Sequence, residues 1–493
     1  MTDKAFLEGR KYARAQLGRV LVLGLGVSGK AGARYFLDLL GTRVEALHIA
    51  AGKRNDAAEA WAAQAVARGA VVSFDTESFS ESYDLCIASP GISEFSDFYL
   101  NAAAASTEII SEVEFAWRES AADSRWIAIT GTNGKTTTTA MIEHVLKSAG
   151  LSAAAVGNIG DACIDAVANQ NLDIYVAEVS SYQLASTRAF APNVALVLNI
   201  TPDHLSWHGS HEAYAAAKWK ILDNLPQVPG AVAVLDATND EVRAKVRELR
   251  ALSGEERGFA YIPVGTKAGL AGDMRQACGS DNAAFVDGEG VLRVAVNGSE
   301  FALCAADALR VKGSHNVANA LAAASAALAV GVEPQAVADG VSSFQALEHR
   351  IEPCGDVAGV ECYNDSKATN VDSVLAAVAA FGSVKPIIML GGRDKGTDLA
   401  PLVAACCQHA KSVVCFGEAR DRFIEAFEGA ELEVLSAPCM EAALDEALSV
   451  AVAGDVVLLS PACASFDEFS CYQERGTRFK QMVAERSAAV KGE

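Results

Sequence analysis

Short apolar runs alternate with longer amphipathic segments along most of the chain. The runs at 127–130, 173–179 and 194–200 are almost continuously apolar, which is typical of strands in a parallel sheet that is covered on both faces. Segments such as 136–149 have the length and composition of helices. This alternation of strand and helix predicts an α/β protein.

The α/β pattern starts three times along the chain. At 493 residues the chain is too long for a single hydrophobic core. We expect three domains: a Rossmann-like domain at 1–112, a central domain at 113–346 and a second Rossmann-like domain at 347–493. Residues 231–311 look peripheral to the central domain, with a hairpin that turns at 287–288. The strands predicted for the first and third domains are 19–24, 43–50, 70–74, 84–88, 360–363, 386–390, 412–416, 432–435 and 456–460.

The segment 126–140, WIAITGTNGKTTTTA, is the most informative stretch of the sequence. A buried strand breaks at two glycines into a helix, so that backbone N–H groups converge on one point and Lys135 adds a full positive charge. Thr136 has the hydroxyl that binds the magnesium of a nucleotide in P-loops. The motif is the shortened form G-x-x-G-K-T, because Ile129 stands where the full pattern has glycine. It predicts a P-loop domain for a nucleoside triphosphate and Mg²⁺; a glycine turn that only packs a helix on a sheet is the alternative.

A second glycine pattern, G-x-G-x-x-G at 24–29, follows the first predicted strand. It matches the dinucleotide fingerprint, but a NAD site also needs an acidic residue at the end of the next strand, and 43–50 ends in Leu-His-Ile-Ala. Three interpretations stay open at this point: NAD, another phosphate-bearing ligand, and a purely structural turn.

Polar residues follow the apolar strands of the central domain. Glu178 lies near the end of the strand at 173–179, and His204 follows the strand at 194–200. Ligands of open α/β sheets bind beyond the carboxyl ends of the strands, so these side chains should face the predicted P-loop. They are candidate metal ligands; a helix-capping carboxylate and a surface histidine are the alternatives.

Three polar clusters follow strands of the third domain. They lie at 364–370, 391–396 and 460–465, and two of them contain a lysine. Three such clusters at one edge of a sheet favour an anion-binding site over ordinary loop composition.

The composition limits the class of partner. The chain has 62 acidic and 41 basic residues and a net charge of −21, which argues against binding to nucleic acid or to a membrane surface. Residues 1–16 lack the apolar core of a signal peptide, and the alanine-rich helix predicted at 317–332 is too short to span a bilayer. The twelve cysteines include no C-x-x-C pair, which favours buried cytosolic thiols. We expect a cytoplasmic protein without a nucleic-acid or membrane partner.

Taken together, the motifs resemble those of a known family, the Mur ligases of peptidoglycan synthesis. The resemblance extends from Gly24 to Lys480. The motifs, in order, are GLGVSG, SPGI, TGTNGKTT, GNIG, EVSSYQL, TPDH, AAK, GSHNVANA, LEHRIE, NDSKATN, GGRDKG and SPACASFDEF. The last four resemble the branch of the family that adds D-glutamate.

The resemblance implies an ADP-forming amide ligase of cell-wall biogenesis that uses ATP and two Mg²⁺ ions, and we expect a monomer. The carboxylate of UDP-N-acetylmuramoyl-L-alanine would first become an acyl phosphate, and the amine of D-glutamate would then displace phosphate. Three alternatives remain: another Mur ligase or folylpolyglutamate synthetase with a different amino acid, a non-catalytic nucleotide-binding module, and a nicotinamide dehydrogenase.

The resemblance also implies roles for individual residues. ATP is expected at Gly131, Thr132, Asn133, Gly134, Lys135, Thr136, Thr137, Asn316, Asn319, Arg350 and Asp365. The UDP-linked substrate is expected at Val27, Ser28, Ser89, Gly91, Asn158 and His204, and D-glutamate at Thr369, Lys395, Ser465 and Tyr472. The implied catalytic residues are Lys135, Glu178, His204, Lys218 and Lys367.

The implied metal ligands are Thr136, Glu178, His204 and Lys218. Lys218 would act as an N6-carboxylated lysine, because a carbamate offers the oxygen ligand that Mg²⁺ prefers and an ammonium does not. Without that modification, the position would be a surface lysine.

The sequence departs from the family pattern at several points. Ser206 and Trp207 follow TPDH-Leu where an aspartate is usual, and Tyr472 stands in place of a phenylalanine. The strand at 43–50 lacks the acidic-Thr-Arg end that often contacts uracil. Residues 254–299 form an insertion for which the sequence suggests no function.

Overall fold

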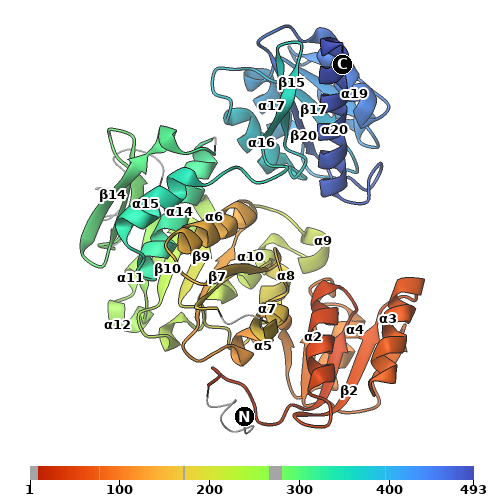
Figure 1. The fold of residues 1–493 in the computed structure, drawn as a ribbon, viewed down its shortest axis with the longest axis vertical. Coiled ribbons are helices and arrows are strands. Elements are labelled where there is room, and N and C mark those ends of the chain that lie inside the picture. The colour runs from red at the N-terminus through yellow and green to blue at the C-terminus, as the bar shows by residue number, and fades with distance from the viewer. Residues whose placement is uncertain are drawn as a thin grey trace. The chain divides into compact units, whose positions relative to one another are not determined.

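The computed structural model describes residues 9–76, 78–169, 172–265, 280–311, 313–394 and 396–492. The fold is α/β, and its strands form three sheets in which parallel pairs predominate. The chain divides into two compact units: Met1–Ala308 with Ala318–Ser342, and Leu309–Val317 with Ser343–Glu493. The first unit contains two of the sheets and the second unit contains the third (Figure 1). No helix among the described residues is both long enough and apolar enough to cross a membrane.

The first sheet has five parallel strands in the order β3-β2-β1-β4-β5. The strand order reverses beside β1, which is where open α/β sheets leave a crevice for ligands. The G-x-G-x-x-G segment leaves β1 at this place. The elements are β1 (Gly18–Leu23), α2 (Val27–Asp38), β2 (Val44–Ala51), α3 (Asp56–Ala67), β3 (Val71–Phe74), β4 (Leu85–Ala88), α4 (Asp97–Ala104), β5 (Ile109–Ser111) and α5 (Glu112–Glu119).

The second sheet has nine strands in the order β14-β13-β12-β11-β10-β9-β6-β8-β7. The pairs from β7 to β12 are parallel, and β12, β13 and β14 pair antiparallel. The strands are β6 (Arg125–Thr130), β7 (Ala153–Gly157), β8 (Ile174–Glu178), β9 (Val194–Val197), β10 (Val232–Asp236), β11 (Ala260–Val264), β12 (Ala283–Val286), β13 (Val291–Val296) and β14 (Ser299–Ala305).

The structure of this sheet tests two predictions about residues 231–311. The predicted hairpin is confirmed by the antiparallel pair β12–β13. The prediction that the whole segment is peripheral is wrong, because β10 and β11 continue the parallel sheet and β10 is buried along its full length. The part of the insertion 254–299 that the structure describes supplies β11, β12 and β13 to this sheet.

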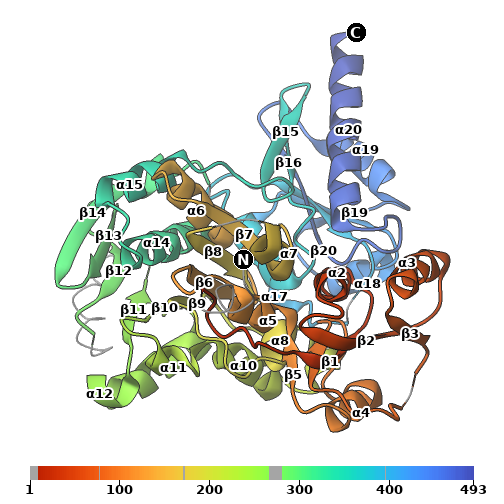
Figure 2. The same ribbon diagram turned by 60° about the horizontal axis from the view of Figure 1, so that its bottom comes forward.

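Helices α6, α14 and α15 lie side by side over the second sheet (Figures 1 and 2). Small residues allow the close approach: a Cβ at Gly340 would lie 3.0 Å from Val145 Cα, and α14 is buried continuously from Ala318 to Leu328. The α-helices between β6 and residue 343 are α6 (Lys135–Ser148), α7 (Cys163–Asn169), α8 (Ser181–Ala185), α9 (Leu205–His208), α10 (His211–Trp219), α11 (Asp240–Ala251), α12 (Gly254–Arg257), α14 (Ser314–Ala329) and α15 (Pro334–Ser343).

A buried ion pair binds the first sheet to α5, the helix that leads into the second sheet. Arg43 Nη1 donates to Glu119 Oε2 at 2.7 Å and Arg43 Nη2 donates to Glu119 Oε1 at 2.8 Å, so the pair is bidentate. The Tyr35 hydroxyl donates to the same Oε2 at 2.8 Å. One apolar core also continues from the first sheet to the second, so the two sheets of this unit form one body.

The third sheet has the order β15-β16-β20-β17-β18-β19, with β15 antiparallel to its neighbour and the other pairs parallel. Apolar residues of α19 and α20 pack on one face, and those of α16, α17 and α18 pack on the other. The elements are β15 (Glu352–Val357), β16 (Val360–Asn364), α16 (Val371–Ala379), β17 (Ile387–Gly391), α17 (Ala400–His409), β18 (Ser412–Phe416), α18 (Arg420–Ala426), β19 (Glu433–Ser436), α19 (Met440–Val450), β20 (Val456–Ala462) and α20 (Tyr472–Lys491).

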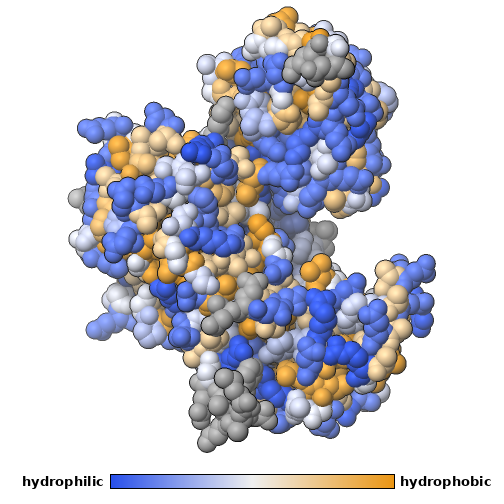
Figure 3. Space-filling model, in the orientation of Figure 1, coloured by the Kyte–Doolittle hydropathy of each residue, from blue (hydrophilic) through white to orange (hydrophobic). Residues whose placement is uncertain are grey.

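The surface carries interspersed hydrophilic and hydrophobic residues on the face drawn in Figure 3. Eleven described cysteines are free thiols; six are buried and five are partly exposed, so the prediction of buried thiols holds for only part of them. Cys278 lies outside the described residues.

Replacement of Gly29 by alanine is expected to destabilise the first sheet. A Cβ at Gly29 would lie 2.1 Å from Gly24 O and 2.6 Å from Ser89 Oγ, so α2 would have to move away from β1. We expect the free energy of unfolding to fall by about 2 kcal/mol, as for other overpacked sites, in urea denaturation.

Gly26→Ala is the matched control for this substitution. Gly26 has φ −70° and no atom within 4 Å of an added Cβ, so its free energy of unfolding should change by less than about 0.5 kcal/mol. Equal destabilisation by the two substitutions would contradict the packing argument.

Candidate active site

The central glycine loop, residues 131–134, connects β6 to α6. Gly134 has φ +82° at the N-cap of α6, and a Cβ there would lie 2.6 Å from Asn319 Oδ1 and 3.2 Å from Leu198 Cδ1, so only glycine fits. No side chain caps α6, and its first turn has no acidic residue. The N–H groups and the positive end of the helix dipole are therefore available to an external anion.

Residues that follow β9 hold this loop in its shape. The Thr132 N–H donates to Asn199 O at 2.8 Å, the Asn133 N–H donates to Asn199 Oδ1 at 2.7 Å, and Asn199 Nδ2 donates back to Asn133 O at 3.1 Å. The Thr132 hydroxyl lies 2.9 Å from the Tyr214 hydroxyl of α10. The predicted convergence of strand ends on the loop is confirmed for β9, and the loop is ordered by protein contacts alone.

Two lysines point at one carbonyl of the loop. Lys135 Nζ donates to Gly131 O at 2.8 Å and to Thr132 O at 2.9 Å, and Lys218 Nζ donates to the same Gly131 O at 2.8 Å. Lys218 is 1% exposed, so its interpretation as a surface lysine is wrong. Burial, and then repulsion by Lys135, hold the pKa of Lys218 well below its usual range. The surroundings of Lys218 therefore disfavour its charged form.

Glu178 ends β8, the strand on the other side of β6, and its side chain is buried. Asn158 Nδ2 donates to Glu178 Oε1 at 2.7 Å, whereas Oε2 has no hydrogen-bond partner among the described residues. The capping interpretation is wrong, because Ser180 and Gln183 form the capping box of α8. A buried carboxylate oxygen without a donor suits a cation, so the residue fits the predicted metal site.

His204 lies at the N-cap of α9 with φ +52°, and its side chain is 41% exposed. Its ring centroid lies 4.9 Å from that of Tyr182, and its Nε2 lies 3.6 Å from Asp203 Oδ2. Thr136, in the first turn of α6, is also partly exposed. The His204 ring and the Thr136 hydroxyl are therefore accessible to a ligand at this edge of the sheet.

Sequence reasoning missed His208, which is buried beside this group. His208 Nε2 lies 3.0 Å from Ser181 Oγ, and its ring centroid lies 5.4 Å from that of Tyr214. Burial, followed by the charges of His204 and Lys218, lowers its pKa to about 4. The only signal in the sequence is its spacing of one helical turn from His204.

The N-terminal glycine loop, residues 24–29, presents the start of α2 in a similar way. Helix α2 has no side-chain cap and no acidic residue in its first turn, and Val27 is 79% exposed. Ser28 is partly exposed, Gly91 is exposed and Ser89 is buried. The loop thus also suits an anion, and the final strand residues of β2, His48 to Ala51, supply no carboxylate for a ribose.

A hydrogen bond joins the segment after β4 to α9, whose N-cap residue is the predicted metal ligand His204. The Ser93 hydroxyl donates to Trp207 O at 2.9 Å. The two predicted substrate regions of the first unit are therefore physically connected.

In the second unit, the predicted residues gather at the carboxyl ends of β16 and β20. Asp365 is buried, and its Oδ2 accepts from Ser460 Oγ at 2.7 Å; burial raises its pKa to about 7. Lys367 Nζ lies 3.8 Å from the centre of the Tyr472 ring. Ser465 is buried, and Thr369 and Arg350 are partly exposed. Lys395 lies outside the described residues.

Asn316 and Asn319 lie one turn apart on α14. Asn319 contacts the central glycine loop through the close approach to Gly134. Asn316 belongs to the second unit of the chain.

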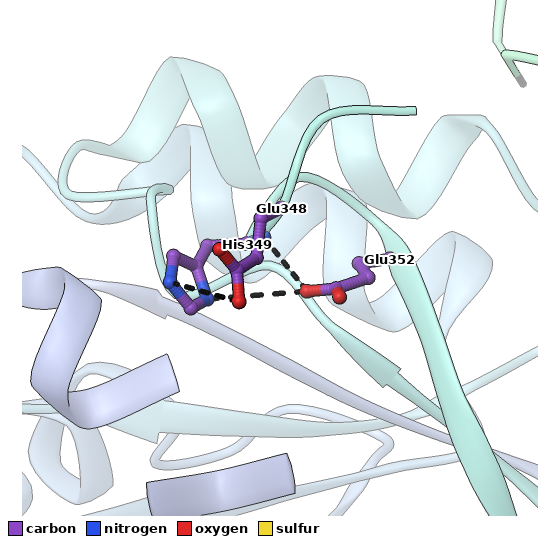
Figure 4. A group of neighbouring side chains, drawn as sticks. All are labelled: Glu348, His349 and Glu352. Atoms are coloured by element: carbon purple, nitrogen blue, oxygen red, sulfur yellow. Dashed lines mark hydrogen bonds and ion pairs between the residues drawn. The ribbon is translucent and has the colours of Figure 1, made fainter. Parts of the chain in front are cut away.

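One further cluster, Glu348, His349 and Glu352, has side-chain ligand atoms within 4.8 Å of one another (Figure 4). Lys480 pairs with Glu348 and, at 3.0 Å, with Glu352, and Asn364 Nδ2 lies 2.9 Å from His349 Nδ1. Because a lysine of α20 already supplies the positive charge, we interpret the cluster as a structural link between α20 and the start of β15.

Comparisons with known proteins agree with the sequence motifs. Residues 129–327 match the family model of the Mur ligase middle domain, and residues 349–463 match that of the Mur ligase, glutamate ligase domain. The chain is 39% identical over 475 residues to the UDP-N-acetylmuramoylalanine--D-glutamate ligase of Streptomyces avermitilis, covering 94% of this chain and 97% of that protein. It is 36% identical over 471 residues to the protein of the same name from Syntrophus aciditrophicus, with 94% and 97% covered.

Solved structures show a similar fold. A pseudomurein peptide ligase type C from Methanothermus fervidus has a TM-score of 0.56 at 17% identity, covering 95% of this chain and 99% of that chain. MurF ligase from Thermotoga maritima, in complex with ADP, has a TM-score of 0.57 at 16% identity, with 90% and 95% covered.

The buried His208 predicts a pH dependence of stability. The unfolded chain protonates this histidine below about pH 6.5, whereas the folded chain does so only near pH 4, so protonation favours unfolding. Stability should therefore fall as the pH drops from 6.5 to 4. In thermal unfolding, the Tm of His208→Gln should fall less steeply across this window than that of the wild type, with pH 8 as the common reference. Parallel curves would contradict the buried neutral state.

Proposed function

The chain belongs to the Mur ligase family, and on this premise we propose that it joins D-glutamate to UDP-N-acetylmuramoyl-L-alanine with conversion of ATP to ADP and phosphate. The observation that carries the proposal is the near full-length similarity to ligases named for that activity. The product would be a cytoplasmic precursor of peptidoglycan. The absence of an acidic residue at the end of β2 argues against the dehydrogenase alternative.

Each sheet would serve one substrate. A Rossmann-like domain at 1–112 would hold the UDP group at the N-terminal glycine loop, a P-loop domain at 113–346 would hold ATP, and a second Rossmann-like domain at 347–493 would hold D-glutamate. The uncapped starts of α2 and α6 support the first two assignments, because each offers free N–H groups to phosphate. We propose a monomer.

The first chemical step would bring two anions together. An oxygen of the alanyl carboxylate forms a bond to the γ-phosphorus of ATP, and the bond from that phosphorus to ADP breaks. Lys135 would turn from the loop carbonyls Gly131 O and Thr132 O to the phosphates and neutralise part of their charge.

The residues around the loop fit a magnesium site. Thr136 and the unpartnered oxygen of Glu178 would hold one of the two Mg²⁺ ions, and His204 and Lys218 would hold the other. Bound Mg²⁺ supplies positive charge that offsets the phosphate oxygens. The other carboxylate oxygen of Glu178 accepts a hydrogen bond from Asn158. Asn158 would therefore orient this carboxylate as well as contact the UDP-linked substrate.

The surroundings of Lys218 favour formation of a carbamate on its amine. Its burial and the nearby Lys135 favour the neutral amine, which is the form that attacks CO₂. The resulting carbamate is an anion with oxygen donors, and it would remove the repulsion between the two lysines.

The second step would occur beside the second unit's strand ends. The amine nitrogen of D-glutamate attacks the acyl carbon, loses a proton, and phosphate leaves with the oxygen that came from the carboxylate. Lys367 and Lys395 would balance the negative charges, and Thr369, Ser465 and Tyr472 would hold the amino acid. The position of Lys367 against the Tyr472 ring supports a joint role of these two residues.

The proposal predicts phosphate release that depends on D-glutamate. The purified protein with ATP, Mg²⁺ and UDP-N-acetylmuramoyl-L-alanine should release phosphate with D-glutamate and not with L-glutamate, L-lysine or diaminopimelate. Lys135→Ala should lower kcat by at least about a hundredfold, because the transition-state charge loses its cation.

Lys147→Ala is the matched control on the same helix. Lys147 is exposed and pairs with Glu143, so its removal should leave kcat within about twofold. Turnover with another amino acid would contradict the proposed specificity for D-glutamate but keep the ligase reaction. Full turnover of Lys135→Ala would favour a non-catalytic nucleotide-binding module.

The carbamate predicts chemical rescue. Lys218→Ala should lose at least about a hundredfold in kcat, and added formate or acetate should restore part of it, because a small carboxylate can enter the space left and supply the oxygen ligand. Chloride at the same ionic strength is the control. If chloride restored kcat as well, or if formate and acetate failed to restore it, the carbamate would be contradicted.

A further inference from the structure

Arg475 of α20 is a fully buried arginine, 1% exposed. Its Nε donates to Ser366 Oγ at 2.9 Å and its Nη2 donates to Ser366 O at 2.7 Å. Its Nη1 and Nη2 both donate to Cys463 O at 3.1 Å. Ser366 follows β16 and Cys463 follows β20, so one guanidinium joins two strand ends that are far apart in the sequence.

The loop after β17 packs against the same guanidinium. A Cβ at Gly392 would lie 3.1 Å from Arg475 Nη1 and 2.3 Å from Ala464 O. The Arg393 N–H donates to Ala464 O at 2.8 Å, which ties this loop to the one after β20. The three polar clusters of the sequence, 364–370, 391–396 and 460–465, therefore meet at Arg475.

The charge of Arg475 is not matched by its direct contacts. Every hydrogen-bond acceptor that the described residues give it is a neutral carbonyl or hydroxyl oxygen. Burial lowers its pKa to about 10, which still leaves it protonated at neutral pH. The nearby carboxylates of Asp467, Glu468 and Asp365 favour the charged form and offset part of the cost of burial.

The same helix also orients Lys367. The Ser366 hydroxyl donates to Tyr472 O at 2.8 Å, and the Tyr472 ring lies 3.8 Å from Lys367 Nζ. Because Arg475 donates to both Ser366 oxygens, loss of its guanidinium would release the segment that carries Lys367.

We propose that Arg475 is a positioning residue for the amino-acid substrate: it holds together the three strand-end loops at which D-glutamate would bind. The inference rests on the proposed function, which puts D-glutamate at these loops. Among the described residues, Arg475 donates to Ser366 and Cys463 of these loops, so its effect on the substrate is transmitted by the loops.

Steady-state kinetics of the full-length protein test this role. Arg475→Lys keeps the charge but cannot make the forked donations, and Arg475→Ala removes both. We expect the KM for D-glutamate to rise about tenfold in Arg475→Lys and further in Arg475→Ala, with the KM values for ATP and UDP-N-acetylmuramoyl-L-alanine within about twofold of the wild type. Arg478→Lys, at an exposed arginine on the same helix, is the matched control and should change none of the three.

Chemical rescue separates positioning from a general loss of structure. Guanidinium chloride, well below denaturing concentrations, should lower the KM of Arg475→Ala for D-glutamate, whereas urea, which has a similar shape and no charge, should not. An unchanged KM for D-glutamate, an equal rise in all three KM values, or the same effect of urea would overturn the inference.

The assay of the wild-type protein distinguishes failure of this inference from failure of the proposed function. No wild-type phosphate release with D-glutamate would overturn both. Wild-type release together with unaltered Arg475 variants would overturn the positioning role alone.

Discussion

Two lysine side chains donate to one backbone oxygen at the centre of the first unit, and the chemistry of the site depends on that crowding. Lys135 and Lys218 both lie 2.8 Å from Gly131 O. Two adjacent ammonium groups repel, and the buried Lys218 is the one whose pKa falls. We propose that Lys135 supplies positive charge to the phosphates and that Lys218, whose charged form is disfavoured, takes up CO₂. With the unpartnered oxygen of Glu178 beside them, the loop has the charges that an ATP-dependent ligase needs.

Parallel sheets bring such groups together because all their carboxyl ends meet at one edge. In the second sheet, the central strand β6 ends in the glycine loop, and its neighbours β8 and β9 lead to Glu178 and Asn199. In the third sheet, β16, β17 and β20 end in three loops that meet at Arg475. At both edges, basic side chains donate to backbone or hydroxyl oxygens of the loops and so hold the strand ends together.

Local signals in the sequence were sufficient for the α/β class, the two glycine loops and the strands that end in polar residues. The strands β10 and β11 were missed although Pro229-Gly230 before β10 is a turn motif, because their place in the sheet depends on the pairing of β10 with β9 and of β11 with β10, which no local signal indicates. Residues whose importance depends on distant contacts could not be recognised: the burial of Lys218 depends on packing against the loop 87 residues before it, and that of Arg475 on Ser366, 109 residues before it. The predicted roles of individual residues remain predictions.

The central claim is that the alanyl carboxylate attacks ATP directly. The most direct test is turnover of UDP-N-acetylmuramoyl-L-alanine labelled with ¹⁸O in its carboxylate, with the released phosphate analysed by mass spectrometry. An acyl phosphate transfers one carboxylate oxygen to phosphate, so the account predicts one ¹⁸O atom in the phosphate for each amide formed. Amide formation with unlabelled phosphate would contradict it.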